Sequence, residues 1–447
     1  MSDTQASAAR PGLSRVLGLW SLVIYGIVLV QPTAPMSPFG VVSAKAEGHV
    51  VTAILIGMVA MLFTAISYGR MAAVYPSAGS AYAYVGHTLH PALGYATGWS
   101  MLFDYVMNPI ICVIWCSKAA ANFLALPFPV WATFFALLFT VLNLQGVKTS
   151  ARTNALIAGG LCLVIVLFLV AAFRYLASVT LDAAALTRPF YDPATFAWDK
   201  VSTGTSLAVL TYIGFDGIST LSEEAKNPRR NILLATVIVC LFTGVVGSLL
   251  VYLGQLIWPD WSSYPDVDTA FVHVAGRAGG PILFGVLNLA LLVANMGSGL
   301  GAQLGASRLL YGMGRDNAIP RGFFGAVNPR THVPSNNVIL VGALALAGAF
   351  TVSYGLGAEL LNFGAFIAFM GVNLSALVHY WWRAERKTLL NLLPPLVGLV
   401  ICAYLWWSLS SAARVAGFAW LVTGIAYGAW KTQGFKKPIE FREANDE

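Results

Sequence analysis

Charged residues are scarce in this sequence. Aspartate, glutamate, lysine and arginine together make up 10% of the 447 residues, whereas hydrophobic residues make up 57%. A soluble domain carries roughly a quarter charged residues, so this composition excludes that class and indicates a polytopic membrane protein.

Cysteine and histidine are also sparse, with five and six residues respectively, and no CxxC pair occurs. The cysteines all lie inside apolar runs and their number is odd, which argues against a disulfide framework or a zinc site. The histidines show no metal-ligand spacing. We therefore expect no metal and no cofactor.

Motifs for nucleotide-driven or hydrolytic chemistry are missing as well. The sequence has no Walker-type phosphate loop, no HExxH and no GxSxG. Neither an ATP-driven pump nor an enzyme is predicted. The net charge of +7 lies mostly in short loops, where it would face anionic lipid head groups. The expected partner is thus the lipid bilayer and not a nucleic acid.

Long apolar segments fill the chain instead. Each has about the ~20 residues that a helix needs to cross ~30 Å of hydrocarbon, or somewhat more. They predict an all-α polytopic membrane protein with twelve transmembrane helices. The segments are 16–43, 51–75, 92–123, 128–146, 153–175, 201–224, 231–256, 281–312, 336–354, 358–382, 389–409 and 413–431.

The distribution of lysine and arginine predicts the orientation. With the N-terminus inside, 19 of the 26 basic residues fall on the cytoplasmic side, which is the side that short basic loops favour. Both terminal tails, 1–15 and 432–447, are then cytoplasmic. The outer loop after the seventh helix, WPDWSSYPDVDTAFVHVAG, is acidic by contrast.

The first apolar segment is interrupted by Pro32, Pro35 and Pro38. Three prolines at this spacing cannot continue a straight helix, because each removes a donor and clashes with the preceding turn. Inside a membrane such a break is tolerated only where protein or a water-filled cavity surrounds it. An interrupted first helix is typical of a transporter binding site.

The sixth segment carries a second interruption. Gly214 and Gly217 flank Phe215 and Asp216, and Asp216 is well placed to cap a half-helix that begins at Gly217. A capping carboxylate at an interrupted helix can also face the binding site, so Asp216 is a candidate substrate-binding residue as well. The two interrupted segments lie five helices apart. This spacing predicts two inverted repeats of five helices with a binding site near the membrane midplane.

Four ordered motifs carry a family resemblance: SYGRMAAVYPSAGSAYAYV, GYATGWSMLFDYV, TYIGFDGISTLSEEAKNPRRNI and ASRLLYGMGRDNAIP. Together they resemble the amino acid–polyamine–organocation permeases. The resemblance implies a leucine-transporter-like fold with 5+5 inverted helices and substrate held between helices 1, 3, 6, 8 and 10. The transport core would be 16–382, with repeats 16–175 and 201–382, and 383–431 would form peripheral helices 11 and 12.

Asp104, Tyr105 and Pro109 in helix 3 look most like the bacterial putrescine importers of this family. A carboxylate deep in a membrane helix is costly and usually faces the bundle interior. Asp104 could therefore bind a substrate ammonium or a coupling proton, or it could fix helix 3 through a hydrogen bond or ion pair. Tyr105 and Asn108 follow it, and aromatic faces attract organic cations.

Further candidates come from the resemblance and from position. The resemblance places the carbonyls of Tyr212, Ile213 and Gly214 near a substrate amine and makes Phe215 an aromatic lid, with a core phenylalanine as the alternative. Lys118 is a candidate for coupling or simply snorkels from the end of helix 3. Weaker candidates by position are Asn295 and Ser298 in helix 8 and Asn362 and Phe363 in helix 10.

The first break departs from the family in one respect. Amino acid permeases usually carry glycines there, whose bare amides bind the substrate carboxylate. Here Gln31, Thr33 and Ala34 stand among prolines, which favours a substrate without a carboxylate, although Thr33 and Ala34 keep their amides. We predict a secondary active transporter in the bacterial inner membrane that imports putrescine or a related polyamine, coupled to protons. The alternative is an amino acid permease, either symporter or exchanger.

Overall fold

The computed structural model describes residues 15–75, 80–146, 151–222, 224–315 and 319–434; the predicted tails lie almost entirely outside these ranges. Within them the chain is helical, and the sole β-type pairing is a single bridge between Leu17 and Ala225. The α-helices are α1 (Leu19–Val30), α2 (Phe39–Lys45), α3 (Val50–Val74), α4 (Ser80–Thr88), α5 (Pro91–Ala121), α6 (Phe128–Leu144), α7 (Ala151–Ala177), α8 (Ala183–Thr187), α9 (Trp198–Ala208), α10 (Pro228–Ile257), α11 (Ala270–Arg315), α12 (Arg321–Phe324), α13 (Ser335–Thr351), α14 (Tyr354–Leu377), α15 (Leu389–Trp407) and α16 (Ser411–Lys431).

Four shorter helical segments complete the described chain. Three are 3₁₀ segments, η1 (Val209–Tyr212), η2 (Phe215–Leu221) and η3 (Trp261–Ser263), and the fourth is a π-helical turn, η4 (Val378–Trp382). The predicted all-α class is thus confirmed for the described residues.

Eight helices in the described ranges are long and apolar enough to cross a membrane. Three more apolar helices, α1, α6 and α13, are shorter. Each of the twelve predicted apolar segments contains helix, and the helix is interrupted within the first and the sixth segments.

Both predicted interruptions are present. The first helix stops at Val30, where Gln31 has a positive φ of 68°, and α2 begins only at Phe39. The sixth continues from α9 directly into η1, stops at Tyr212, and resumes as η2 after Gly214 with φ 117°. Proline in the first case and a left-handed glycine in the second account for these stops.

One predicted boundary is wrong. We expected an outer loop to extend to residue 276 and the eighth helix to begin at 281, but α11 begins at Ala270. A kink at Gly280, with φ 73°, precedes Pro281 and divides this long helix. The kink explains the error, because a proline preceded by glycine is also the signal of a helix start.

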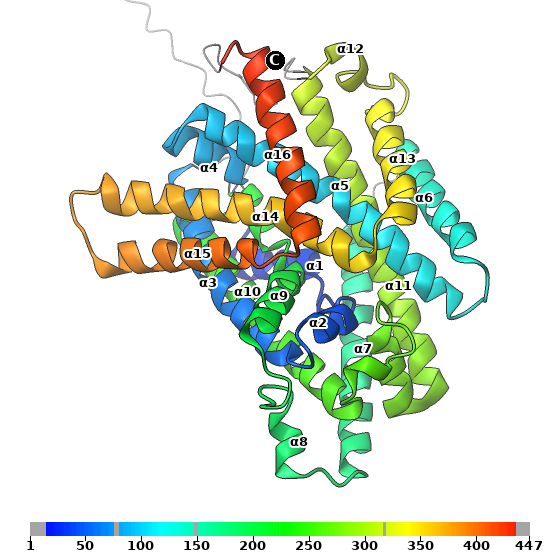
Figure 1. Cartoon of the computed structure of the whole chain (residues 1–447). Helices are drawn as coiled ribbons and strands as arrows, with labels where there is room; N and C mark the ends of the chain where they lie inside the picture. Colours follow the sequence, from blue (N-terminus) through cyan, green and yellow to red (C-terminus); the bar gives the residue numbers. More distant parts are fainter. Residues whose placement is uncertain (1–14, 76–79, 147–150, 223, 316–318, 435–447) are drawn as a thin grey trace, which may run out of the picture.

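Helix α5 runs diagonally through the middle of the molecule and packs against α4, α6, α11, α13, α14 and α16 (Figure 1). The backbones of α5 and α14 approach closely at Gly364, where a Cβ atom would collide with the carbonyl oxygen of Ser100. Helices α14 and α15 lie side by side (Figure 1). The central position of α5 brings Asp104 within electrostatic range of Asp216 in the second interruption.

Candidate functional site

The two helix interruptions are in direct contact. Gly214 lies against the last turn of α1, where a Cβ atom would be 3.3 Å from the carbonyl oxygen of Leu29 and 3.4 Å from the Cα atom of Val30. The side chain of Leu29 also fills the space beside Gly217. Glycine is therefore required at position 214 for two reasons, its positive φ and this close backbone approach.

The first interruption is fixed to a single turn of α11. Gln31 donates from Nε2 to the carbonyl of Ala294 at 3.0 Å, and Asn295 donates from Nδ2 to the hydroxyl of Ser37 at 3.0 Å. These bonds attach both ends of the interrupted stretch to neighbouring residues. They bring the predicted site residues Gln31 and Asn295 together.

Accessibility follows a three-residue spacing along this stretch. Gln31, Ala34 and Ser37 are partly exposed, whereas Thr33 is buried at 1% exposure. Gln31 and Ser37 are the two residues bonded to α11, so the accessible face of the stretch is the face toward that helix.

The backbone amides of the first interruption are largely engaged in turns. Ala34 donates to the carbonyl of Gln31 at 3.1 Å, and Met36 donates to the carbonyl of Thr33 at 2.9 Å. Pro32, Pro35 and Pro38 have no N–H. Few amides are therefore left to bind a substrate carboxylate here, and Ala34, which we had considered for that role, is occupied.

Carbonyl groups dominate the meeting point of the interruptions. The last carbonyls of a helix lack intrahelical partners, and the carboxyl end of a helix carries partial negative charge. The α1 helix ends at Val30 and the continuous α9–η1 helix ends at Tyr212. Since Gly214 lies against the end of α1 and follows the end of η1, the partial negative charges of the two helix ends add together there, which favours a cation.

Asp216 lies inside η2 as its second residue and does not cap a helix that follows it. The N–H of Gly214 donates to Oδ1 of Asp216 at 3.2 Å, and η2 has no side-chain cap. The predicted capping role is wrong because η2 begins at Phe215, earlier than expected. The carboxylate of Asp216 thus accepts a hydrogen bond from a backbone N–H of the second interruption itself.

Asp104 on α5 is partly exposed, and its charge interacts repulsively with that of Asp216. Tyr105 is the next residue on α5. Its ring lies against Gly305 of α11, where a Cβ atom would be 3.0 Å from the ring, and it is 37% exposed. The charge of Asp104 is thus within electrostatic range of Asp216, and Tyr105 lies beside it on the same helix.

Asn108 joins α5 to α11 one turn further along. Its Oδ1 accepts from the hydroxyl of Ser298 at 3.3 Å and from the thiol of Cys112 at 3.3 Å. The structure therefore brings the predicted site residues Asn108 and Ser298 together.

Phe215 is fully buried in an aromatic cluster. Its ring centroid lies 5.5 Å from that of Tyr68 on α3 and 5.6 Å from that of Phe369 on α14. Tyr212 is also buried, and its hydroxyl donates to the carbonyl of Ile54 at 2.7 Å. Ile213 remains partly exposed. In this conformation Phe215 occupies the position of a core side chain, which was the alternative to a lid.

Phe363 faces away from the interruptions. It packs against Trp406 of α15 and Phe418 of α16 and fills the space beside Gly417. This packing gives no support to its predicted place in the binding site. The neighbouring Asn362 turns toward α9 instead, where Nδ2 donates to the carbonyls of Ser206 at 2.7 Å and Leu207 at 3.1 Å.

Lys118 lies at the far end of α5, roughly 21 Å along the helix from Asp104 at 1.5 Å per residue. Its ammonium pairs with Asp268 at 2.6 Å and with Asp266 at 3.3 Å, and Trp115 donates to the carbonyl of Asp268 at 2.8 Å. Burial raises the pKa of Asp268, and the Lys118 ammonium acts against that rise. Lys118 thus binds the loop that precedes α11 and lies far from the interruptions.

Sequence reasoning missed one ion pair with a buried carboxylate, between Lys45 of α2 and Glu359 of α14, at 3.0 Å. The available signal was a lone glutamate inside the apolar segment 358–382. Among the described residues no group of three or more histidine, cysteine, aspartate or glutamate side chains could hold a metal ion.

Long apolar helices and two interrupted helices in mutual contact define a polytopic membrane permease. The chain belongs to the amino acid permease family, which it matches over residues 22–436. Proteins of this family are transporters, and the chain is not an enzyme.

Three relatives extend over nearly the whole chain. The low-affinity putrescine importer PlaP of Escherichia coli strain K12 is 35% identical, with 97% of each chain covered. The methylthioribose transporter of Bacillus subtilis is 25% identical over 95% of this chain, and the branched-chain amino acid permease BcaP of Lactococcus lactis is 27% identical over 95% of it.

A solved structure supports the fold. A mutant of the Eremococcus coleocola manganese transporter superposes with a TM-score of 0.56 at 14% identity, covering 96% of this chain and 98% of that one. At this identity the likeness concerns the fold alone.

Proposed function

We propose that the chain crosses the inner membrane twelve times, with both termini in the cytoplasm, and is built of two inverted halves of five helices. The packing of predicted counterparts supports this arrangement. Helix α3 packs against α10, α5 against α11, and α6 against α13. The crossed pairs α7–α11 and α5–α14 also pack together, as a two-fold relation between the halves requires.

The transporter imports a small organic cation, putrescine or a related polyamine, by alternating access. The observation that carries this proposal is the pair of carboxylates, Asp104 and Asp216, beside two carbonyl-rich helix ends. Two repelling carboxylates are stabilised by positive charge between them. A diamine without a carboxylate provides that charge and needs none of the amides that this site lacks. The putrescine importer PlaP, at 35% identity, is consistent with the same substrate class.

Uptake of a cation is already favoured by an inside-negative potential, by about 2.3 kcal/mol per charge per 100 mV. A proton that binds Asp104 from the outside together with the substrate, and leaves with it to the cytoplasm, would couple import to an inward proton gradient. This makes a proton the coupling ion in our proposal.

Purified protein in proteoliposomes tests the substrate. We expect labelled putrescine to accumulate with an imposed inside-negative potential and an inward proton gradient, and excess unlabelled cadaverine to compete. Accumulation of neutral amino acids without putrescine uptake would overturn the proposal.

The alternative of an amino acid permease is supported by the relative BcaP, whose name specifies branched-chain amino acids. An amino acid would need donors for its carboxylate. The amides of Ala34, Met36 and Gly214 are engaged within the protein, so we rank this alternative second. Leucine uptake in the same proteoliposomes distinguishes the two.

A further inference from the structure

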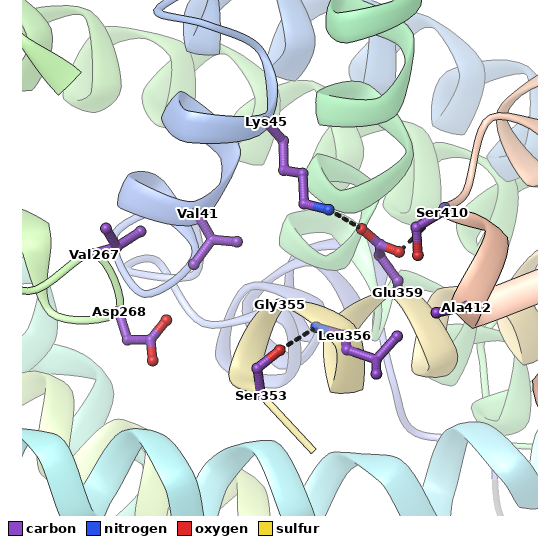
Figure 2. Close-up of a pocket in the computed structure, with 10 residues that line it drawn as sticks. All are labelled: Val41, Lys45, Val267, Asp268, Ser353, Gly355, Leu356, Glu359, Ser410 and Ala412. Atoms are coloured by element: carbon purple, nitrogen blue, oxygen red, sulfur yellow. Dashed lines mark hydrogen bonds and ion pairs between the residues drawn. The ribbon is translucent and has the colours of Figure 1, made fainter. Parts of the chain in front are cut away.

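A pocket of about 420 Å³ lies on the α2 side of the interruptions, apart from Asp104 and Asp216 (Figure 2). It is bounded by α2, the loop before α11, the start of α14 and the start of α16. The charged side chains that line it are Lys45, Glu359 and Asp268. In Figure 2 the ammonium of Lys45 points to Glu359, and Asp268 stands across the pocket from them.

Glu359 is held from two sides. Lys45 lies 3.0 Å from Oε1, and the backbone N–H of Ser410, at the start of α16, donates to Oε2 at 3.2 Å. Glu359 is 1% exposed, whereas Lys45 is 38% exposed. Lys45 can therefore withdraw into water, but Glu359 cannot.

This asymmetry constrains any movement of α2. The α2 helix follows directly from the first interruption. A rearrangement of the interruption that moves α2 away from α14 would therefore separate Lys45 from Glu359. An unpaired buried carboxylate is strongly unfavourable. The separation needs another positive charge at Glu359.

We propose that Glu359 is a second cation-binding site, at which an ammonium group of the arriving amine replaces Lys45. Lys45 then acts as a tethered competitor that neutralises Glu359 until substrate arrives. Only a cation completes the exchange, so α2 separates from α14 for amines and stays closed for neutral solutes. This inference rests on the proposed transport of an organic cation.

The test uses uptake of labelled putrescine by cells that express the protein, with KM and maximal rate measured separately. Replacement of Lys45 by methionine removes the competitor, and we expect KM to fall about 3- to 10-fold. Glu359→Gln keeps an acceptor for Ser410 but removes the charge, and we expect KM to rise at least 10-fold. The conservative Lys45→Arg should retain the wild-type KM within about 2-fold.

The matched control is Lys200→Met, which breaks the more exposed pair of Lys200 and Glu47 at 3.2 Å. Its KM should not change. If the Lys45–Glu359 ion pair only holds α2 against α14, Lys45→Met and Glu359→Gln should shift KM in the same direction, because both variants break this ion pair. A shared direction, or no change in either variant, would overturn the proposal.

Folding is checked separately by fluorescence-detection size exclusion of each variant. If Glu359→Gln does not fold, the Lys45 variants alone test the proposal. An unchanged or raised KM in Lys45→Met would then contradict the proposal that Lys45 competes with the substrate for Glu359. Failure of the proposed function gives a different result, namely no putrescine uptake by the wild-type protein.

Discussion

The backbone N–H of Gly214 donates to the carboxylate of Asp216 across 3.2 Å at the second interruption. An amide that could bind a substrate carboxylate is thus occupied by a carboxylate of the protein. The same arrangement places a negative charge beside the carbonyl ends of α1 and η1. One hydrogen bond therefore disfavours anionic groups and favours cationic ones at this site.

Replacement of Asp216 by asparagine should weaken putrescine binding while the hydrogen bond to Gly214 is retained. The side-chain oxygen of asparagine still accepts, but the charge is lost. A charge-assisted hydrogen bond contributes about 1.5–3 kcal/mol, so we expect KM for uptake to rise about 10- to 150-fold. Asp199→Asn, which removes an exposed charge on α9, should leave KM unchanged. An unaltered KM in Asp216→Asn would remove the residue from the binding site.

Gly214→Ala should impair both stability and transport. The residue has φ 117°, and the added Cβ atom would lie 3.3 Å from the carbonyl oxygen of Leu29, so strain of roughly 1–3 kcal/mol is expected. Gly159→Ala is the matched control, because nothing lies within 4 Å of its added Cβ atom. Thermal unfolding in detergent and putrescine uptake measure the effect. Equal behaviour of the two variants would show that the close approach at Gly214 is not required.

Both interruptions could be predicted from the sequence, because proline and glycine act on the local backbone wherever they stand. Pro32, Pro35 and Pro38 stop a helix through their own rings, and Gly214 permits a left-handed turn without help from distant residues. The long apolar segments are a similar local signal. These properties need no knowledge of which helices are neighbours.

The direction in which a side chain points could not be predicted in the same way. Asn362 and Phe363 are adjacent in sequence, yet one bonds to α9 and the other packs on α15 and α16. Their assignment depends on how α14 is rotated about its axis, which tertiary packing decides. The pairing of Lys45 with Glu359 depends likewise on contacts between residues 314 positions apart.

Lys118 and Asp268 should respond differently to mutation as the pH changes. Burial raises the pKa of Asp268, so the Asp268 carboxylate binds a proton more tightly in the folded state than in the unfolded chain. As the pH rises and Asp268 ionises, its contribution therefore lowers the free energy of unfolding. Asp268→Asn should therefore be neutral or stabilising at pH 8. Lys118→Met removes the cation that offsets this effect and should destabilise by about 1–3 kcal/mol.

The destabilisation by Lys118→Met should diminish as the pH falls, because the raised pKa of Asp268 lets its carboxylate take up a proton at a higher pH than an ordinary aspartate. Thermal unfolding between pH 5 and pH 8 measures both variants. A pH-independent loss of stability in Lys118→Met would contradict this account of the ion pair.

Asp104→Asn should abolish the response of uptake to a proton gradient, whereas Lys118→Met should retain it. Asp104 interacts with the charge of Asp216 beside the interruptions, whereas Lys118 is bound to a loop at the end of α5. In proteoliposomes at a fixed membrane potential, an inward proton gradient should raise the rate of putrescine uptake by the wild type and by Lys118→Met. The rate for Asp104→Asn should be at least 10-fold lower and equal with and without the gradient, since asparagine cannot carry the coupling proton inward with the substrate. Asp104→Glu, which keeps the charge, should restore part of the response. Full proton dependence in Asp104→Asn would assign coupling to another group.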